Sequence, residues 1–258
     1  MEKHMKQRLF LLLVCLGLAT PLLATPYGHI HLAAPDAQEA AEWYARHFGG
    51  TPTRFGNSSQ YPIDRVMMGN IAVIFFERDP GEGSVGTGVD HIGFSMGDVE
   101  QTFAGIVADG GKGLGDLRAF AGMTLGFVED PWGTKIELID DPDLRGPHHI
   151  HLSTPDPEAT LAWYQNAFGG ESAQFGGALP GINYGDIWLL AARARAEIAP
   201  TLGRSLDHLG WNFPDLAAAA VELKAKGVEF SMEPRDYRGI RISFVTGPDD
   251  VRIELVQP

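Results

Sequence analysis

The feature that most constrains the fold is a short pattern that the chain uses twice. Residues 27–36, YGHIHLAAPD, return in altered form at 149–156 as HIHLSTPD. In both copies histidines alternate with aliphatic residues, which predicts a β-strand with imidazoles on one face and aliphatic side chains on the other. The chain is therefore a tandem duplication, and strands of this kind indicate a site built on a sheet.

A helix is predicted directly after each of these strands. Asp36 and Asp156 are in N-cap positions, and Glu39 supplies the second member of a capping box with Asp36. Paired glycines at 49–50 and 169–170 end the two predicted helices. The strand, the helix and its end are thus preserved in both copies.

A second pair of related segments follows the first. Residues 89–94, VDHIGF, return at 206–211 as LDHLGW, and helices are predicted after them at 98–108 and 215–226. The clearest further strands are predicted at 71–76, 124–128 and 135–139. The chain is thus predicted to contain four modules in two pairs, each a strand, a helix and three strands, which is an α+β fold.

Two domains are predicted on either side of a polar linker. Residues 140–147, DDPDLRGP, separate 27–140 from 147–258, and each of these stretches contains two modules. The composition, with 44% hydrophobic and 21% charged residues, is that of an ordinary globular protein. A formal net charge of −13 argues against nucleic acids and anionic membrane surfaces as partners.

Residues 1–24 differ from the rest of the chain. Lys3, Lys6 and Arg8 precede an apolar run, a pattern typical of a secretory signal peptide with cleavage after Ala24. We therefore expect a periplasmic or secreted protein that has no membrane attachment after cleavage. The single cysteine, Cys15, falls inside this leader, so core packing rather than disulfides is expected to stabilise the domains.

Two glutamates need an explanation. Glu137 and Glu254 each stand between aliphatic residues in an apolar strand and point to the same face as the histidines. Burying an unpaired carboxylate is costly, so a cation is expected beside each one. One interpretation is an ion pair with Lys135 or Arg252, two positions away on the same face. The other is a divalent metal ion (Fe2+, Mn2+, Ni2+ or Zn2+) held by two histidines and a carboxylate, with open positions for a substrate.

The metal interpretation rests on residue types that recur in both halves. The candidate ligands are His29, His91, Glu137, His149, His208 and Glu254. His31 and His151, on the same faces, are candidates for a catalytic general base or a substrate contact, because imidazole titrates near neutral pH. Hydrogen bonding to a neighbouring strand is the alternative role for both.

The sequence resembles the vicinal oxygen chelate superfamily, which includes glyoxalases, fosfomycin-resistance proteins, ring-cleaving dioxygenases and bleomycin-binding proteins. The resemblance rests on the four modules, the openings HIGF at 91–94 and HLGW at 208–211, and the run DPWGTKIEL at 130–138. It implies that two modules pair to form a cupped mixed sheet with helices on its outer face. It also implies that metal ligands come from the first strand of each module and the last strand of the second. Transferred to this chain, the resemblance groups His29, His91 and Glu137 in one cup, and His149, His208 and Glu254 in the other.

The chain departs from each named branch of this superfamily. Glyoxalase I has a fourth protein ligand on the last strand of its first module, where this chain is apolar at 72–75 and 187–190. Ring-cleaving dioxygenases have a tyrosine shortly before the glutamate, where Phe127 and Phe244 stand here. Bleomycin-type binders usually lack the metal ligands.

The function expected from this resemblance is that of an exported metal-dependent enzyme of lyase or isomerase type. It would bind a small molecule through two adjacent oxygens and stabilise an enolate or alkoxide. An Fe(II) ring-cleaving dioxygenase and a non-catalytic periplasmic binding protein are the alternatives. Pairing of the modules within one chain and exchange across a homodimer both stay open.

Overall fold

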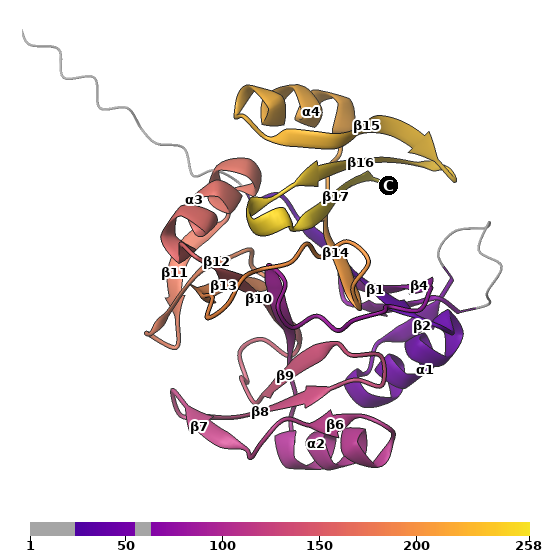
Figure 1. Cartoon of the computed structure of the whole chain (residues 1–258), viewed down its shortest axis with the longest axis vertical. Helices are drawn as coiled ribbons and strands as arrows, with labels where there is room; N and C mark the ends of the chain where they lie inside the picture. Colours follow the sequence, from indigo (N-terminus) through magenta and orange to yellow (C-terminus); the bar gives the residue numbers. More distant parts are fainter. Residues whose placement is uncertain (1–23, 55–62) are drawn as a thin grey trace, which may run out of the picture.

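The computed structural model describes residues 24–54 and 63–258. The predicted signal peptide, apart from Ala24, lies outside the described residues. Two large mixed sheets form the centre of the molecule, and the helices cover their outer faces (Figure 1). In the part of the chain that the structure describes, no helix combines the length and apolar character needed to cross a membrane.

The four predicted modules are all present. The first contains β1 (Tyr27–Ala34), α1 (Ala37–Phe48), β2 (Thr51–Thr53), β3 (Arg65–Met68) and β4 (Ile71–Glu77). The second contains β5 (Val89–Ser95), α2 (Val99–Ala108), β6 (Lys112–Gly113), β7 (Arg118–Phe120), β8 (Met123–Glu129) and β9 (Lys135–Ile139). The third contains β10 (Gly146–Thr154), α3 (Pro157–Phe168), β11 (Glu171–Phe175), β12 (Leu179–Asn183) and β13 (Trp188–Arg193). The fourth contains β14 (Leu206–Asn212), α4 (Leu216–Ala225), β15 (Glu229–Tyr237), β16 (Ile240–Thr246), a short 3-10 turn (Pro248–Asp250) and β17 (Arg252–Gln257).

An aspartate caps each of the α-helices that the structure describes, α1 to α4. The side chains of Asp36, Asp98, Asp156 and Asp215 each accept a hydrogen bond from the backbone amide three residues later, at 2.8 to 3.1 Å. Such a cap satisfies an amide that has no partner within the helix and contributes about 1 kcal/mol. The helix starts predicted from these aspartates are confirmed.

The sheets show how the modules pair. One sheet has the strand order β15-β16-β17-β14-β1-β4-β3-β2 and joins the first module to the fourth. The other has the order β11-β12-β13-β10-β5-β9-β8-β6 and joins the third module to the second. We call the concave faces of these sheets cup A, centred on the antiparallel pair β1 and β14, and cup B, centred on β5 and β10. The two paired cups are confirmed, whereas the predicted partners within each cup are wrong.

The linker between the halves explains why the third module pairs with the second and the fourth with the first. Ile139 ends β9 beside Ser95 on one side of β5, and Gly146 begins β10 beside Ser95 on the other side. The connection 140–145 therefore only crosses the end of β5. Short connections place consecutive elements next to each other, so the third module joins the second and the fourth is left to pair with the first.

Helix packing joins the modules that strand pairing leaves apart. The Phe48 ring of α1 stacks on Phe94 of β5, with ring centroids 4.2 Å apart. The Phe168 ring of α3 stacks on Trp211 of β14 at 4.4 Å. One hydrophobic core therefore runs between the helices and the convex faces of both sheets, and it holds the two cups in a fixed relation.

Candidate metal centre

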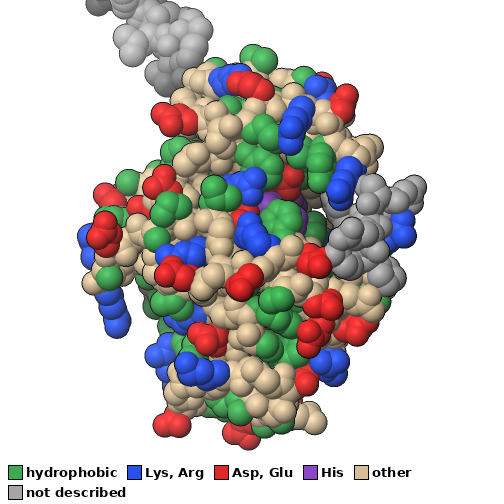
Figure 2. Space-filling view, turned by 45° about the vertical axis from the view of Figure 1, so that its right-hand side comes forward, with side chains coloured by type: hydrophobic (Ala, Val, Ile, Leu, Met, Phe, Trp, Pro, Cys, Tyr) green, Lys and Arg blue, Asp and Glu red, His purple; other side chains and the backbone are tan. Residues whose placement is uncertain are grey.

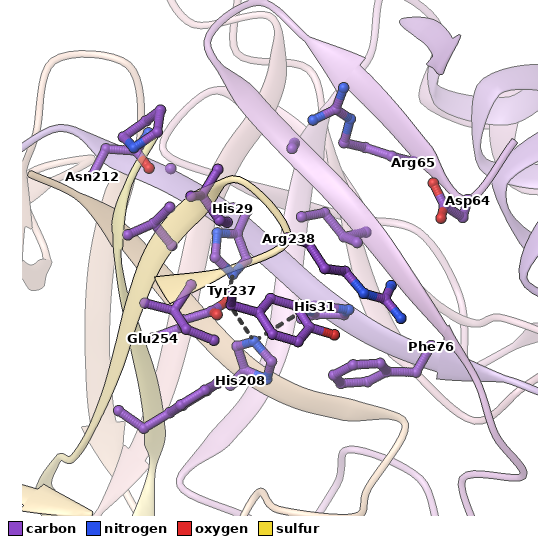
Figure 3. Close-up of a pocket in the computed structure, with 18 of the residues that line it drawn as sticks. His29, His31, Asp64, Arg65, Phe76, His208, Asn212, Tyr237, Arg238 and Glu254 are labelled. Atoms are coloured by element: carbon purple, nitrogen blue, oxygen red, sulfur yellow. Dashed lines mark hydrogen bonds and ion pairs between the residues drawn. The ribbon is translucent and has the colours of Figure 1, made fainter. Parts of the chain in front are cut away.

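Cup A brings together three imidazoles and a carboxylate, which we call cluster A: His29, His31, His208 and Glu254. One ligand atom from each lies within 4.8 Å of the others. Strand pairing accounts for the convergence, because β1 and β14 are adjacent and Glu254 on β17 is in register with Gly210 on β14. Figure 3 shows the imidazoles and the carboxylate pointing toward one another.

Glu254 is the centre of the contacts in cluster A. Its Oε2 lies 3.0 Å from His29 Nε2 and 3.2 Å from His208 Nε2. Burial alone would raise the pKa of Glu254, but its contacts with His208 and His29 outweigh burial and hold the pKa below its ordinary value. A carboxylate that stays ionised among imidazoles is suited to binding a cation.

A buried carboxylate fixes the orientation of His208. Asp207 Oδ1 lies 2.7 Å from His208 Nδ1, and Asp207 is itself held by Arg78 at 2.9 Å and Arg252 at 2.6 Å. With Nδ1–H donated to Asp207, Nε2 points into the cluster toward Glu254, where it would offer its lone pair to a bound ion. This carboxylate–histidine arrangement is typical of metal-binding histidines.

A glycine makes room for His29. Gly210 faces the ring from β14, and a Cβ at this position would lie 2.0 Å from His29 Cε1. No other residue fits there without displacing the imidazole. The glycine two residues after the histidine in the repeated motif is therefore explained by the space that the opposite histidine needs.

Cup B repeats this construction in cluster B: His91, Glu137, His149 and His151. Ligand atoms of these residues also lie within 4.8 Å of one another. Glu137 Oε2 lies 3.1 Å from His91 Nε2 and 3.7 Å from His149 Nε2. A Cβ at Gly93 would lie 2.1 Å from His149 Cε1, the counterpart of the contact in cup A.

The partners around cluster B differ from those in cup A. His91 Nδ1 lies 3.2 Å from Asp90 Oδ2, and Asp90 is paired with Lys135 at 2.6 Å. His149 Nδ1 contacts His148 Nδ1 at 2.7 Å, and His148 Nε2 contacts Asp141 at 3.1 Å. The rings of His91 and His149 are therefore held by neighbouring side chains. In cluster A, Asp207 holds His208 and Gly210 leaves the space for His29.

Both clusters fit a divalent ion. His29 Nε2 and His149 Nε2 are buried and make no hydrogen bond, although a glutamate lies near each of them. Burial lowers the pKa of His29 and of His149, so both rings are neutral and have a lone pair to offer. Neutral imidazoles and a carboxylate are the ligands of zinc and of first-row transition metals.

The two cups differ in what lies in front of the cluster. A cavity of about 560 Å³ opens onto cluster A, with apolar walls that include Ala72, Ile74 and Phe244. Figure 2 shows histidine at the bottom of this hollow, with basic and apolar side chains around it. His31 forms part of its lining and stacks on Phe76, with ring centroids 3.7 Å apart.

Apolar side chains occupy the concave face of cup B instead. Trp188 is in register with His149, whereas the residue in register with His29 is Ala72. Phe120, Phe127 and Trp188 pack on a buried cluster of Leu125, Ile139, Phe175 and Leu190. A Cβ at Gly176 would lie 2.8 Å from Phe120, so the two ends of this sheet approach each other closely.

The structure gathers all six predicted ligands into the two clusters. Each cluster contains one predicted histidine ligand from each half of the chain. The predicted grouping of His29 with His91 and Glu137, and of His149 with His208 and Glu254, is wrong because each sheet combines modules from both halves. His31 and His151 lie at the clusters as predicted, and their catalytic role stays a prediction.

Several functional contacts were not predicted from the sequence. Lys135 and Arg252 pair with Asp90 and Asp207 rather than with the glutamates. The dipeptide Asp-His, present at 90–91 and 207–208, was the signal for these orienting carboxylates.

These features define a protein of paired strand-helix-strand modules with two clusters that could hold a metal ion, and comparison with known proteins identifies the family. The model of the Glyoxalase/Bleomycin resistance protein/Dioxygenase superfamily matches residues 27–138 and 146–255. The chain therefore belongs to this superfamily, and the resemblance stated from the sequence is confirmed.

Individual relatives add detail. A probable chloroplastic lactoylglutathione lyase of Arabidopsis thaliana is 32% identical over 94 residues, which are 34% of this chain and 26% of that protein. The match thus spans about a quarter of that relative. Glyoxalase I from Zea mays has a TM-score of 0.73 at 19% identity, covering 91% of this chain and 92% of that one. A putative dioxygenase from Bacillus subtilis has a TM-score of 0.60 at 15% identity, with coverages of 91% and 85%. At these identities the two structures show a shared fold.

Proposed function

We propose that this protein is an exported metal-dependent enzyme whose active site is cup A. Its substrate is a small molecule that presents two adjacent oxygen atoms to cluster A, and its reaction is of the lyase or isomerase type. The observation that carries the proposal is the convergence of His29, His208 and Glu254 at the floor of the cavity. The leader at residues 1–24 supports export.

A divalent ion held by His29, His208 and Glu254 would supply Lewis-acid stabilisation of negative charge that develops on a substrate oxygen. The protein contributes the fixed positions of these three side chains, set by Gly210 and Asp207. It also contributes an apolar wall, which limits water around the reacting atoms and strengthens electrostatic effects there.

His31 is the residue we assign to proton transfer. Its Nδ1 lies 3.0 Å from His208 Nε2, and its ring is held against Phe76. It therefore stands at the edge of the ligand set and in the lining of the cavity, within reach of a molecule bound there. Its position next to His208 makes a fourth-ligand role the alternative that mutagenesis must separate.

A ring-cleaving Fe(II) dioxygenase is the second candidate. Two histidines and one carboxylate with open positions form the ligand set of many non-haem Fe(II) oxygenases, and cluster A contains such a set. The putative dioxygenase from Bacillus subtilis shares the fold. Oxygen uptake by the iron-loaded protein with a panel of catechols distinguishes this reaction from isomerase or lyase chemistry, which consumes no oxygen.

The experiment that tests the proposal combines metal analysis with reconstitution. Purified protein is stripped of metal and reloaded separately with Fe2+, Mn2+, Ni2+ and Zn2+, and bound metal and thermal unfolding are measured. We expect binding with a raised Tm, and His208→Ala is expected to remove the metal of cup A. Reloaded protein is then assayed with lactoylglutathione, because the Arabidopsis relative is named for it, and with catechols. A protein that takes up none of the four metals contradicts the proposal.

A further inference from the structure

The lining of cup A has a charge opposite to that of the whole chain. The formal net charge is −13, yet four arginines line the cavity, against two carboxylate side chains, those of Asp64 and Glu254. The arginines are Arg65, Arg235, Arg238 and Arg252. An acidic protein that concentrates guanidinium groups around one cavity creates a local preference for anions.

Two of these arginines have no carboxylate partner in the structure. Arg252 forms an ion pair with Asp207 at 2.6 Å. Arg235 and Arg238, by contrast, form no ion pair within residues 24–54 and 63–258, and the adjacent Asp236 is paired with Arg241 at 3.2 Å. Their positive charges are therefore available to a ligand.

The backbone directs Arg235 toward the cavity. The pairing of β15 with β16 shifts register between Met232 and Arg235. Because of this shift, Met232 is paired with Phe244 and Arg235 with Ile242, although the two β15 residues are three positions apart. Arg235 is paired with Ile242, whose side chain lines the cavity. In a regular strand, residues three apart point to opposite faces, so Arg235 would point away from the face on which Met232 lies. A change in side-chain direction is a common consequence of such an irregularity.

Arg238 is held at the tip of the same hairpin. It has a positive φ of 51°, which is uncommon for a residue other than glycine, asparagine or aspartate. Its guanidinium lies over the ring of Tyr237, with Cζ 5.2 Å from the ring centroid. Figure 3 shows Tyr237 and Arg238 among the residues that line the cavity beside His31 and Phe76.

The equivalent arginine of cup B is used differently. Arg118 on β7 is paired with Leu125, as Arg235 is paired with Ile242. Its Cζ lies 5.1 Å from the centroid of the Phe127 ring, against which Lys135 Nζ also lies. Arg118 thus lies on the aromatic side chains of cup B, whereas Arg235 and Arg238 line the cavity of cup A.

We propose that Arg235 and Arg238 form a subsite for a carboxylate at the outer end of the substrate of cup A. The inner end of the substrate presents two adjacent oxygens to cluster A, and this part of the inference rests on the proposed function. The apolar walls of the cavity contact the part of the substrate between the two ends. The planar guanidinium donates paired hydrogen bonds that match a carboxylate in geometry and charge.

Two probes of the same shape but different charge test this subsite. Zn2+-loaded protein is titrated calorimetrically with 3,4-dihydroxybenzoate and with 3,4-dihydroxybenzamide, both of which have adjacent oxygens. We expect the acid to bind about tenfold more tightly than the amide, and added NaCl to weaken the acid alone. In the Arg235→Gln/Arg238→Gln variant we expect this preference to disappear while the affinity for the amide is retained.

Arg118→Gln is the matched control, and it should keep the preference for the acid. Equal affinity of the wild type for the two probes, failure of the acid to bind, or a preference that survives the double substitution overturns the proposal. Retained amide affinity shows that the double variant is folded. If instead the acid binds metal-free protein as tightly, with the same dependence on both arginines, the subsite stands and the proposed function fails.

Discussion

Cups A and B contain the same set of three histidines and one glutamate at equivalent positions but differ in access. In cup A, Ala72 is in register with the first-strand histidine and a cavity opens onto the cluster. In cup B the equivalent residue is Trp188, and aromatic side chains cover the concave face. The ligands and the glycines that make room for them are thus present in both cups, although the residue beside the first-strand histidine differs. Metal binding and catalysis are therefore expected to separate between the two cups.

The largest expected difference concerns the two glutamates. Glu254→Gln should lower activity on the order of a thousandfold, because it removes the charge that anchors an ion at the open site. Glu137→Gln should change activity less than about threefold, since Trp188 and the aromatic side chains around it cover the concave face of cup B. Each variant should lose about one equivalent of bound metal, measured by elemental analysis. Equal losses of activity in the two variants would show that both cups are catalytic.

The glycines that accommodate the histidines should show the next largest difference. Gly210→Ala places a methyl group on His29 and should lower activity about a hundredfold, because small displacements of catalytic groups are costly. Gly93→Ala makes the same clash with His149 and should leave activity nearly unchanged. Both should lower the free energy of unfolding by about 1–3 kcal/mol, as overpacking does. Urea unfolding of the two variants provides the matched measurement.

The comparison of the two cups also shows which features of the fold and of the clusters could be predicted from the sequence. Alternation of histidine with aliphatic residues and the capping aspartates are local signals, and they predicted the strands, the helices and the faces on which the ligands lie. The partner of each ligand depends on which strands pair, and that is decided by the linker 140–145 crossing the end of β5. Periodicity contains no such information, so His29 was grouped with His91 instead of His208.

Access to the clusters was equally out of reach from the sequence. The residues at positions 72 and 188 were both predicted to lie in apolar strands, and each fits such a strand. Only their register beside a histidine shows that Ala72 leaves space and Trp188 fills it. The arginines of the β15–β16 hairpin likewise depend on a register shift that sequence periodicity does not reveal.

The orienting carboxylates provide a smaller contrast. Asp207→Asn should weaken metal binding in cup A by about 10- to 100-fold, the usual effect of losing a partner that orients a histidine ligand. It should also destabilise the fold by about 3–5 kcal/mol, because Arg78 and Arg252 lose a fully buried partner. Asp90→Asn should weaken cup B similarly but cost less stability, since Asp90 is more exposed and pairs with Lys135. Metal titration and thermal unfolding of both variants test the contrast.

The smallest expected change in activity comes from opening cup B. Trp188→Ala removes the indole beside His149 and leaves in its place the alanine that cup A has at the equivalent position. Activity should rise no more than about twofold, because the rest of the aromatic cluster remains, and a truncated tryptophan costs up to about 3–5 kcal/mol of stability. The informative quantity is the number of 3,4-dihydroxybenzamide molecules bound per chain, which should rise from one toward two in metal-loaded protein. A stoichiometry that stays at one would mean that Phe120 and Phe175 close cup B without the tryptophan. A value of two in the wild type would remove the distinction between the cups.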